Sequence, residues 1–304
     1  MKYAVKYRRD FRHFQDIDEV IFDYETGSDK IVEFIPQVLK RQEQRAVINI
    51  EKIEYIENII PYLNALKEKH PNIVVQLDFF MQKDWIQILK DNDIPIMFSN
   101  FVNNYDLLYT LLKYNPTDVY IIEELGFKLK TLQFLKDAGI KVRCFPDVCQ
   151  SSRGTSQEIP AIQKFWIRPE DTEEYEPYVD IFEIFNLTDQ QSVVYEVYKD
   201  RLWLGDLKNL LSSADDLDLA NDAIDPHFGQ RRINCGKRCM IGECFYCPEV
   251  EKFAKKFKEA HFSILKDKFS EKTEVTPKEA EEILKKLKDR VNEFKSDKDA
   301  VQNE

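Results

Sequence analysis

The stretch DVYIIEELGFKLKTLQFLKDAGIKVRCFPDV, residues 118–148, contains one full repeat of the pattern that decides the fold. It begins with a β-rich run at 118–126 and ends with another at 141–148. Between the two runs, apolar residues recur at helical spacing: Leu129, Leu132, Phe134 and Leu135. A strand, a helix and a strand in series predict two parallel strands joined by a right-handed crossover.

The same alternation extends in both directions from this stretch. The β-rich runs are 19–24, 45–50, 72–78, 94–100, 118–126, 141–148, 164–171 and 179–185. No Gly-rich phosphate turn follows the first run, which favours closure into a barrel over a doubly wound sheet. We therefore predict an α/β protein with a (β/α)8 TIM-like barrel over residues 1–203, in which a polar loop at 150–157 replaces a clear sixth helix.

The pattern changes after residue 203. We expect a cysteine-bearing extension over 204–266 and a charged helical tail over 267–304. Thr276 and Pro277 form a favourable helix start for this tail. The apolar stripe that follows consists of Ala280, Ile283, Leu284, Leu287, Val291 and Phe294. Such a stripe predicts docking on the barrel or on a partner protein's helix.

Composition limits the functions that this chain can have. The 304 residues are 43% hydrophobic, which is enough for a sizeable core, and the net charge of -11 argues against a protein that is basic throughout for nucleic-acid binding. No run approaches the roughly 20 apolar residues that span a bilayer, and the N-terminus lacks the apolar core of a secretory signal. We therefore expect a cytoplasmic protein with no membrane association.

The strongest chemical signal is a cluster of cysteines spaced C-x3-C-x4-C-x2-C. Its members are Cys235, Cys239, Cys244 and Cys247. Thiolates this close together can converge on one metal centre, and the C-x4-C-x2-C portion has the spacing of plant-type ferredoxins. We predict an iron–sulfur cluster, preferably of the 4Fe–4S type; a structural zinc site and unligated core cysteines are the alternatives. Cys149 is a further candidate thiol, because it follows the predicted sixth strand.

Polar residues, among them Asp23, Asn49 and Glu183, end or nearly end several predicted strands, where a barrel places its chemistry. Glu124, Arg168 and Glu170 are the preferred catalytic candidates, because they follow the most apolar strands. Two interpretations of Arg168 stay open. Its guanidinium can bind a substrate carboxylate or phosphate, or it can pair with a neighbouring strand-end acid such as Glu183.

The stretch 117–143 resembles the middle strand–helix–strand of the peptidase family U-32 (collagenase-like). KFWIRPEDTEEY resembles the strand of that family that carries an Arg-Glu pair, and RRINCGKRC resembles its Arg-rich cysteine segment. In this resemblance Glu124 and Glu170 match acidic positions, and Cys235 and Cys239 match the cysteine pair. The resemblance covers roughly residues 117–247. It implies a barrel, an iron–sulfur cluster, and oxygen-independent hydroxylation of RNA bases or quinone precursors; peptidase activity is implied for few members.

Two classes of function remain from the sequence. The favoured hypothesis is an iron–sulfur-dependent enzyme that modifies RNA or a small molecule at the carboxyl-terminal mouth of the barrel. The alternatives are a non-catalytic binding or assembly protein with a structural zinc site, and a peptidase of the same family.

Overall fold

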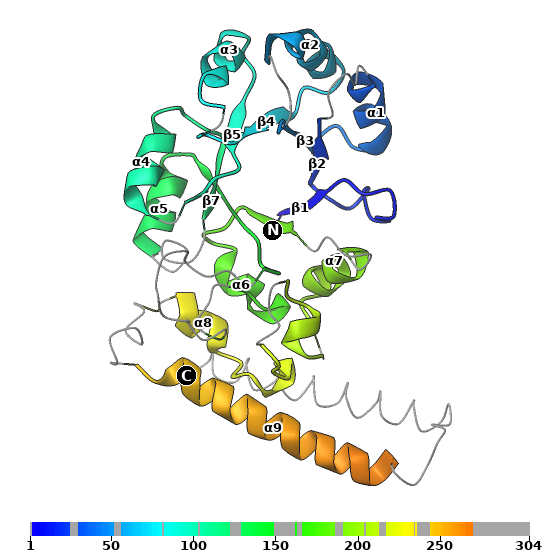
Figure 1. The fold of residues 1–304 in the computed structure, drawn as a ribbon, viewed down its shortest axis with the longest axis vertical. Helices are drawn as coiled ribbons and strands as arrows, with labels where there is room; N and C mark the ends of the chain where they lie inside the picture. The colour runs from blue at the N-terminus through cyan, green and yellow to red at the C-terminus, as the bar shows by residue number, and fades with distance from the viewer. Residues whose placement is uncertain are drawn as a thin grey trace.

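The computed structural model describes residues 2–24, 30–51, 56–80, 82–102, 104–121, 129–148, 162, 166–185, 191–203, 205–212, 217–233, 235 and 244–269, the last eleven of these by their helical backbone alone. Its centre is a parallel sheet that curls into an arc, with helices on the outside (Figure 1). In the part of the chain that is described, the strands follow the spatial order β5-β4-β3-β2-β1-β9-β8-β7-β6. They are β1 (Lys2–Lys6), β2 (Glu19–Asp23), β3 (Arg45–Asn49), β4 (Ile73–Leu77), β5 (Ile96–Phe98), β6 (Phe101–Val102), β7 (Asp118–Ile121), β8 (Lys141–Cys144) and β9 (Ile181–Ile184).

Helices separate most of these strands and cover the outer face of the sheet (Figure 1). They are α1 (Ile31–Val38), α2 (Ile60–Lys69), α3 (Trp85–Asp91), α4 (Tyr105–Leu112), α5 (Leu129–Asp137), α6 (Thr172–Tyr175) and α7 (Gln191–Asp200). The hydrophobic core therefore lies between this face and the helices, where Val119 and Val142 of two neighbouring strands pack with Leu132 of α5.

The sheet curls because its two end strands are consecutive in the chain. β5 pairs with β4 and β6 pairs with β7, while only Ser99 and Asn100 separate β5 from β6. In addition, the Thr117 amide just before β7 donates a 2.8 Å hydrogen bond to the Ile96 carbonyl of β5. The α/β class and a curled parallel sheet flanked by helices are thus confirmed, and they are consistent with the TIM-like expectation.

The N-terminal strand was not predicted. β1 pairs in parallel with both β2 and β9, and it buries Tyr3, Ala4 and Val5. It escaped prediction because its apolar run has only three residues between two lysines. It therefore lies between β2 and β9, the last strand in the chain.

The predicted strand at 164–171 is wrong where the structure describes it. β8 pairs directly with β9, and residues 166–168 lie outside the sheet. Trp166 and Ile167 are buried, as their apolar character required, but Trp166 packs on Phe228 of α8 (Phe228–Ile233) with ring centroids 5.3 Å apart. Pro169 then starts a 3₁₀ turn, η3 (Pro169–Asp171), because proline has no amide hydrogen to offer a strand.

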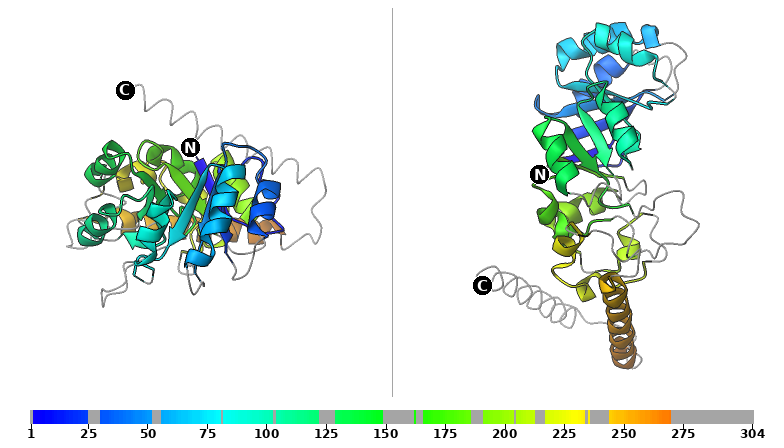
Figure 2. Two further views of the ribbon diagram at one scale, coloured as in Figure 1. Left: turned by 90° about the horizontal axis from the view of Figure 1, so that it is seen from above. Right: turned by 90° about the vertical axis from the view of Figure 1, so that its left-hand side faces the viewer.

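The chain beyond α7 packs at one end of the molecule. It contains two further 3₁₀ turns, η4 (Leu207–Asn209) and η5 (Asn221–Ala223), then α8, and finally α9 (Tyr246–Phe269). Figure 2 shows α9 at the end opposite to α2 and α3. The remaining described 3₁₀ turn, η1 (Ile56–Asn58), precedes α2. The tail predicted over 267–304 lies outside the described residues from residue 270 onward.

Candidate functional site

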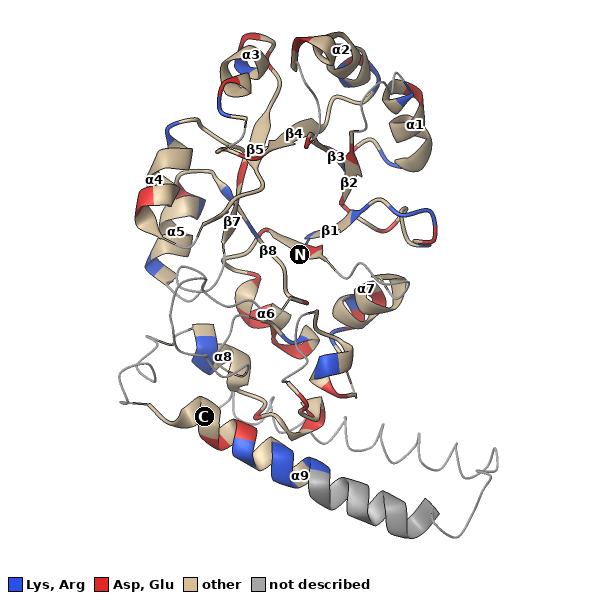
Figure 3. Cartoon of the chain, in the orientation of Figure 1, with Lys and Arg blue, Asp and Glu red and all other residues tan. Residues whose placement is uncertain are grey.

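The inner face of the curled sheet consists of an apolar layer between two polar ends. Alternation along each strand decides which side chains point inward, since every second residue shares a face. The middle inner layer is formed by Ala4, Ile21, Val47, Val74, Met97, Tyr120, Phe145 and Ile181. Residues two positions before or after these on the same strand extend the inner face toward the amino or carboxyl ends, and many of them are charged or polar (Figure 3).

The amino end holds a buried network of ion pairs. The Arg45 guanidinium donates to both carboxylate oxygens of Asp118, at 2.7 and 2.9 Å. Arg45 also pairs with Glu19, and Glu19 pairs with Arg143. All four side chains are nearly inaccessible to solvent. Although burial acts to raise it, the guanidinium groups of Arg45 and Arg143 hold the pKa of Asp118 below its usual range.

The carboxyl end carries a second polar set, which is partly open to solvent. Lys6 pairs with Asp23 at 2.8 Å, and their side chains are 39% and 43% exposed. Asn49 donates from its amide nitrogen to Asp23 at 2.9 Å and to Glu51 at 2.7 Å. In a parallel sheet all carboxyl ends meet at one edge, so these groups share a single surface.

Glu183 of β9 is the buried acid of this edge. The Tyr120 hydroxyl donates to its carboxylate at 2.6 Å, and the Arg143 guanidinium lies 3.4 Å from the same oxygen. Burial raises the pKa of Glu183 above its usual range, and Arg143 and the Tyr120 hydrogen bond offset this only in part. A buried carboxyl with a raised pKa is suited to give or take a proton in a reaction.

Aromatic rings lie beside Glu183. The Tyr120 ring stacks on Phe145 with a centroid distance of 5.2 Å, and Phe101 and Phe185 each contact Phe145 edge-on. Phe101 and Phe185 are each 40% exposed. These rings offer apolar faces to a planar group that approaches the carboxyl end.

Gln76 of β4 has an unsatisfied acceptor on the same face. Its side chain is buried between the inward positions of Asn49 and Met97, its register partners on the two neighbouring strands. Its Oε1 atom has no hydrogen-bond partner in the described part of the chain. A buried acceptor without a partner is costly, so it indicates a place where a donor from a ligand or water can bind.

Arg168 and Glu170 lie away from this edge, at η3. The Arg168 fork donates to both oxygens of Asp171, at 2.6 and 2.7 Å, and its guanidinium lies 5.6 Å from the Phe228 ring centroid. It also donates to the carbonyl of Asp225 at 3.1 Å. This geometry agrees with the ion-pair interpretation of Arg168, but the acid that it pairs with is Asp171 and not Glu183. Arg168 therefore holds η3 against the segment before α8.

Glu170 is also bonded internally. One oxygen, Oε1, accepts from the Trp203 amide at 2.6 Å and from the Asn221 side chain at 2.9 Å. The other oxygen, Oε2, and the Asn221 Oδ1 atom are both buried without a hydrogen-bond partner among the described residues. Burial raises the pKa of Glu170. Both acceptors are satisfied at once if Glu170 is protonated and donates to Asn221, as in a carboxylic acid–amide pair.

Three of the four predicted metal-binding cysteines lie next to or in α8 and α9. Cys235 follows α8 and Cys244 precedes α9, and both are half-buried, whereas Cys247 is buried in the first turn of α9. Cys239 lies outside the described residues, as do Glu124 and Cys149. No group of three or more metal-ligating side chains is found among the residues that the structure describes.

Sequence reasoning identified some members of the carboxyl edge and missed others. Asp23, Asn49 and Glu183 were marked because each ends or nearly ends a predicted strand. Gln76 and Tyr120 were missed. The signal for Gln76 was present, because it is the only polar residue within the apolar run IVVQL.

Comparison with known proteins adds no relative. No known family model matches the chain, and a comparison with curated proteins gives no match. Within the described residues, no helix is both long enough and apolar enough to cross a membrane.

Proposed function

We propose that this protein is a modifying enzyme with a (β/α)8 TIM-like barrel, whose substrate pocket lies at the carboxyl end of the sheet. The observation that carries the proposal is Glu183, a buried acid with a raised pKa that is bonded to Tyr120 on a partly solvent-exposed edge. Glu183 is the proton donor or acceptor. Tyr120 and Arg143 orient its carboxyl group, since both contact the same oxygen.

The inner face of the sheet supports a planar substrate with hydrogen-bonding groups. Phe101 and Phe185 provide the stacking surfaces, and Gln76 Oε1 accepts a hydrogen bond from the bound molecule. An RNA base or a small aromatic molecule has these properties. This substrate class is also the one that the resemblance to the U-32 family implies.

We further propose that Cys235, Cys239, Cys244 and Cys247 hold an iron–sulfur cluster. The two described ends of this segment come close together: the Arg231 guanidinium lies 4.7 Å from the ring centroid of Tyr246, and the Phe228 and Tyr246 centroids are 6.1 Å apart. A segment whose ends meet can bring four thiols around one centre, and the nearby arginine favours thiolates. When bound, such a cluster supplies electron transfer to the reaction.

The internal bonding of Arg168 and Glu170 favours a second candidate function, a non-catalytic binding or assembly protein with structural zinc. In that case both residues serve only to hold the extension on the sheet. Metal content separates the two candidates. Protein purified without oxygen is expected to contain iron and acid-labile sulfide, whereas near-stoichiometric zinc without sulfide would support the assembly protein.

The catalytic part of the proposal is tested separately. Modified nucleosides are compared between cells that lack the gene and cells that express the wild type or Glu183→Gln. We expect the wild type to restore a modification that Glu183→Gln does not restore. Glu173→Gln is the matched control, because Glu173 is a surface carboxylate with a 70% exposed side chain.

Two results would contradict the catalytic proposal. In the first, Glu183→Gln is folded and restores the modification as well as Glu173→Gln does. In the second, neither RNA nor small-molecule extracts differ between cells with and without the gene.

A further inference from the structure

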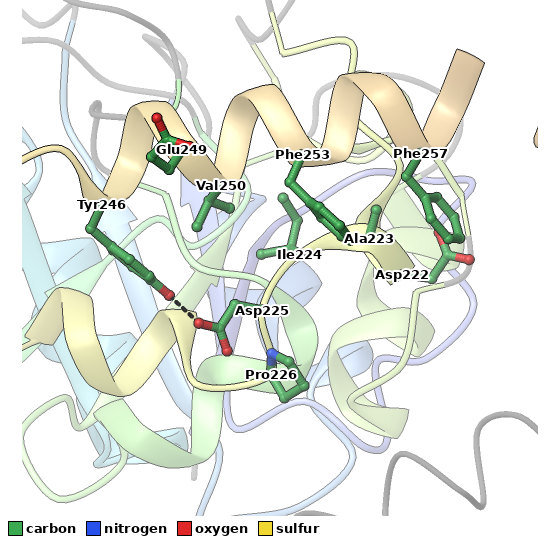
Figure 4. A pocket seen from close by; sticks show the side chains of 10 residues that line it. All are labelled: Asp222, Ala223, Ile224, Asp225, Pro226, Tyr246, Glu249, Val250, Phe253 and Phe257. Carbon is green, nitrogen blue, oxygen red and sulfur yellow. Dashed lines mark hydrogen bonds between the residues drawn. The ribbon is translucent and has the colours of Figure 1, made fainter. Parts of the chain in front are cut away.

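A groove lies between α9 and the segment that contains η5. Its volume is about 440 Å³. Figure 4 shows that side chains from 222–226 form one wall and that one side of α9 forms the other. The α9 wall consists of Tyr246, Glu249, Val250, Phe253 and Phe257. Phe253 is 62% exposed, so the groove presents a large apolar side chain to solvent.

The groove has a fixed shape, because bonds on both walls hold it. The Tyr246 hydroxyl donates to Asp225 at 2.7 Å, across the end of the groove (Figure 4). Farther along α9, the Lys258 ammonium donates to Asp206 at 2.9 Å. A preformed apolar groove favours an amphipathic helix as its occupant, since such a helix fills it without reorganising the protein.

We propose that this groove is the docking site of the chain's own C-terminal segment, residues 277–294. This segment carries the apolar stripe Ala280, Ile283, Leu284, Leu287, Val291 and Phe294, and it follows α9 after only seven intervening residues, 270–276. A connection of this length is in the range that joins two antiparallel helices.

The register of such a hairpin brings the stripe to Phe253 and Phe257. Phe253 lies sixteen positions before Phe269, where α9 ends. Both helices rise about 1.5 Å per residue, so an antiparallel helix that begins at Pro277 is level with Phe253 at about residue 293. Val291 and Phe294 then lie on Phe253, and Leu287 and Val291 lie near Phe257.

Charge supports the same pairing. The groove lining contains three carboxylates, those of Asp222, Asp225 and Glu249. Asp222 lies beside Phe257 (Figure 4), which the register above places level with about residue 289, and the tail around that level, 285–295 (KKLKDRVNEFK), contains five basic and two acidic residues. Opposite charges on the two surfaces favour this occupant over a second copy of the same acidic groove.

Hydrogen–deuterium exchange of the full-length protein tests the proposal. In the double variant Val291→Asp, Phe294→Asp, the groove loses its apolar partner. We expect amide exchange in 246–257 to become at least several-fold faster than in the wild type. Lys278→Asp is the control, because it also introduces an aspartate but lies outside both the stripe and 285–295, and its exchange in 246–257 is expected to match the wild type.

The reciprocal variant keeps the tail intact. Phe253→Asp is expected to speed exchange in 277–294, whereas Phe80→Asp leaves it unchanged, although Phe80 is 70% exposed. Wild-type-like exchange in both the tail double variant and Phe253→Asp would overturn the proposal. So would protection of 246–257 that rises with protein concentration, because it would identify a second copy as the occupant.

Discussion

The two ends of the inner sheet face differ in how their polar groups are satisfied. At the amino end, Arg45 and Arg143 are paired with Glu19 and Asp118 in a network that solvent hardly reaches. At the carboxyl end, the pair of Lys6 and Asp23 is about 40% exposed and the Gln76 acceptor is unsatisfied. We infer from this difference that the amino-end ion pairs hold the strands together. The polar groups at the carboxyl end are the ones that we propose are available to a ligand.

The largest expected effect comes from breaking the amino-end network. Arg45→Ala leaves Asp118 and Glu19 buried without their cation, and removing one partner of a buried ion pair typically costs about 3–5 kcal/mol. Lys6→Ala is the matched change at the carboxyl end, and a surface pair contributes only about 0–1 kcal/mol. Urea unfolding at pH 7 measures both. Equal losses of stability would show that the two ends do not differ as proposed.

The same comparison applies outside the sheet to the buried ion pair between Arg168 and Asp171 at η3. Arg168→Ala is expected to lower the free energy of unfolding by about 3–5 kcal/mol, because Asp171 loses its bidentate partner. Arg168→Lys keeps the charge but not the fork, so its loss should be smaller. Thermal unfolding of both variants checks this order. A stable Arg168→Ala protein that has lost only its activity would instead assign this arginine to the substrate.

The strand pattern allowed much of the fold to be predicted, because short β-rich apolar runs such as 45–50 and 179–185 are visible in the sequence of a single segment. The membership of the sheet was harder to predict. Trp166 and Ile167 of the run KFWIRPED are buried, as expected, yet burial against α8 and burial in a sheet give the same apolar pattern in the sequence. Only the pairing of distant segments distinguishes these two cases. In the structure, β1 is the strand that pairs with β2 and β9.

The site was predictable to the extent that strand ends carry polar residues. Asp23, Asn49 and Glu183 follow from this rule alone. Tyr120 does not, because its hydroxyl reaches Glu183 only across the curled sheet. The partner of Arg168 could not be predicted either. In a strand, the side chain of Asp171 would lie on the face opposite to that of Arg168. The 3₁₀ turn after Arg168 instead brings the two side chains together.

A smaller effect is expected at Glu170, because ionisation removes the proton that this side chain would donate to Asn221. Its pKa is raised in the folded protein, so the folded state binds more protons just above the ordinary value of 4.5. Stability from this group is therefore fully present below pH 4.5 and falls as the pH rises through the folded pKa. Glu170→Gln mimics the neutral acid and can still donate to Asn221.

Melting temperatures of wild type and Glu170→Gln across pH 4–8 test this. We expect the wild type to lose stability relative to the variant as the pH rises. Because Glu183 titrates in both proteins with the same sign, the difference between them isolates Glu170. A constant difference at all pH values would mean that folding does not shift the pKa of Glu170.

The smallest expected effect concerns Gln76, and it tests the carboxyl end most directly. Gln76→Leu removes the unsatisfied Oε1 acceptor at nearly constant volume, so stability is expected to stay within about 1 kcal/mol of the wild type or to rise. Gln44→Leu is the control, because Gln44 is also buried but fully bonded: its Oε1 accepts from the Lys40 and Arg41 amides, and its Nε2 donates to the Phe14 and Ile17 carbonyls. That change should cost about 1–3 kcal/mol for the groups left without partners. Urea unfolding of the two variants gives the comparison. If Gln76→Leu is as destabilising as Gln44→Leu, then Gln76 is a bonded structural residue, and the carboxyl end loses its strongest indication of a ligand.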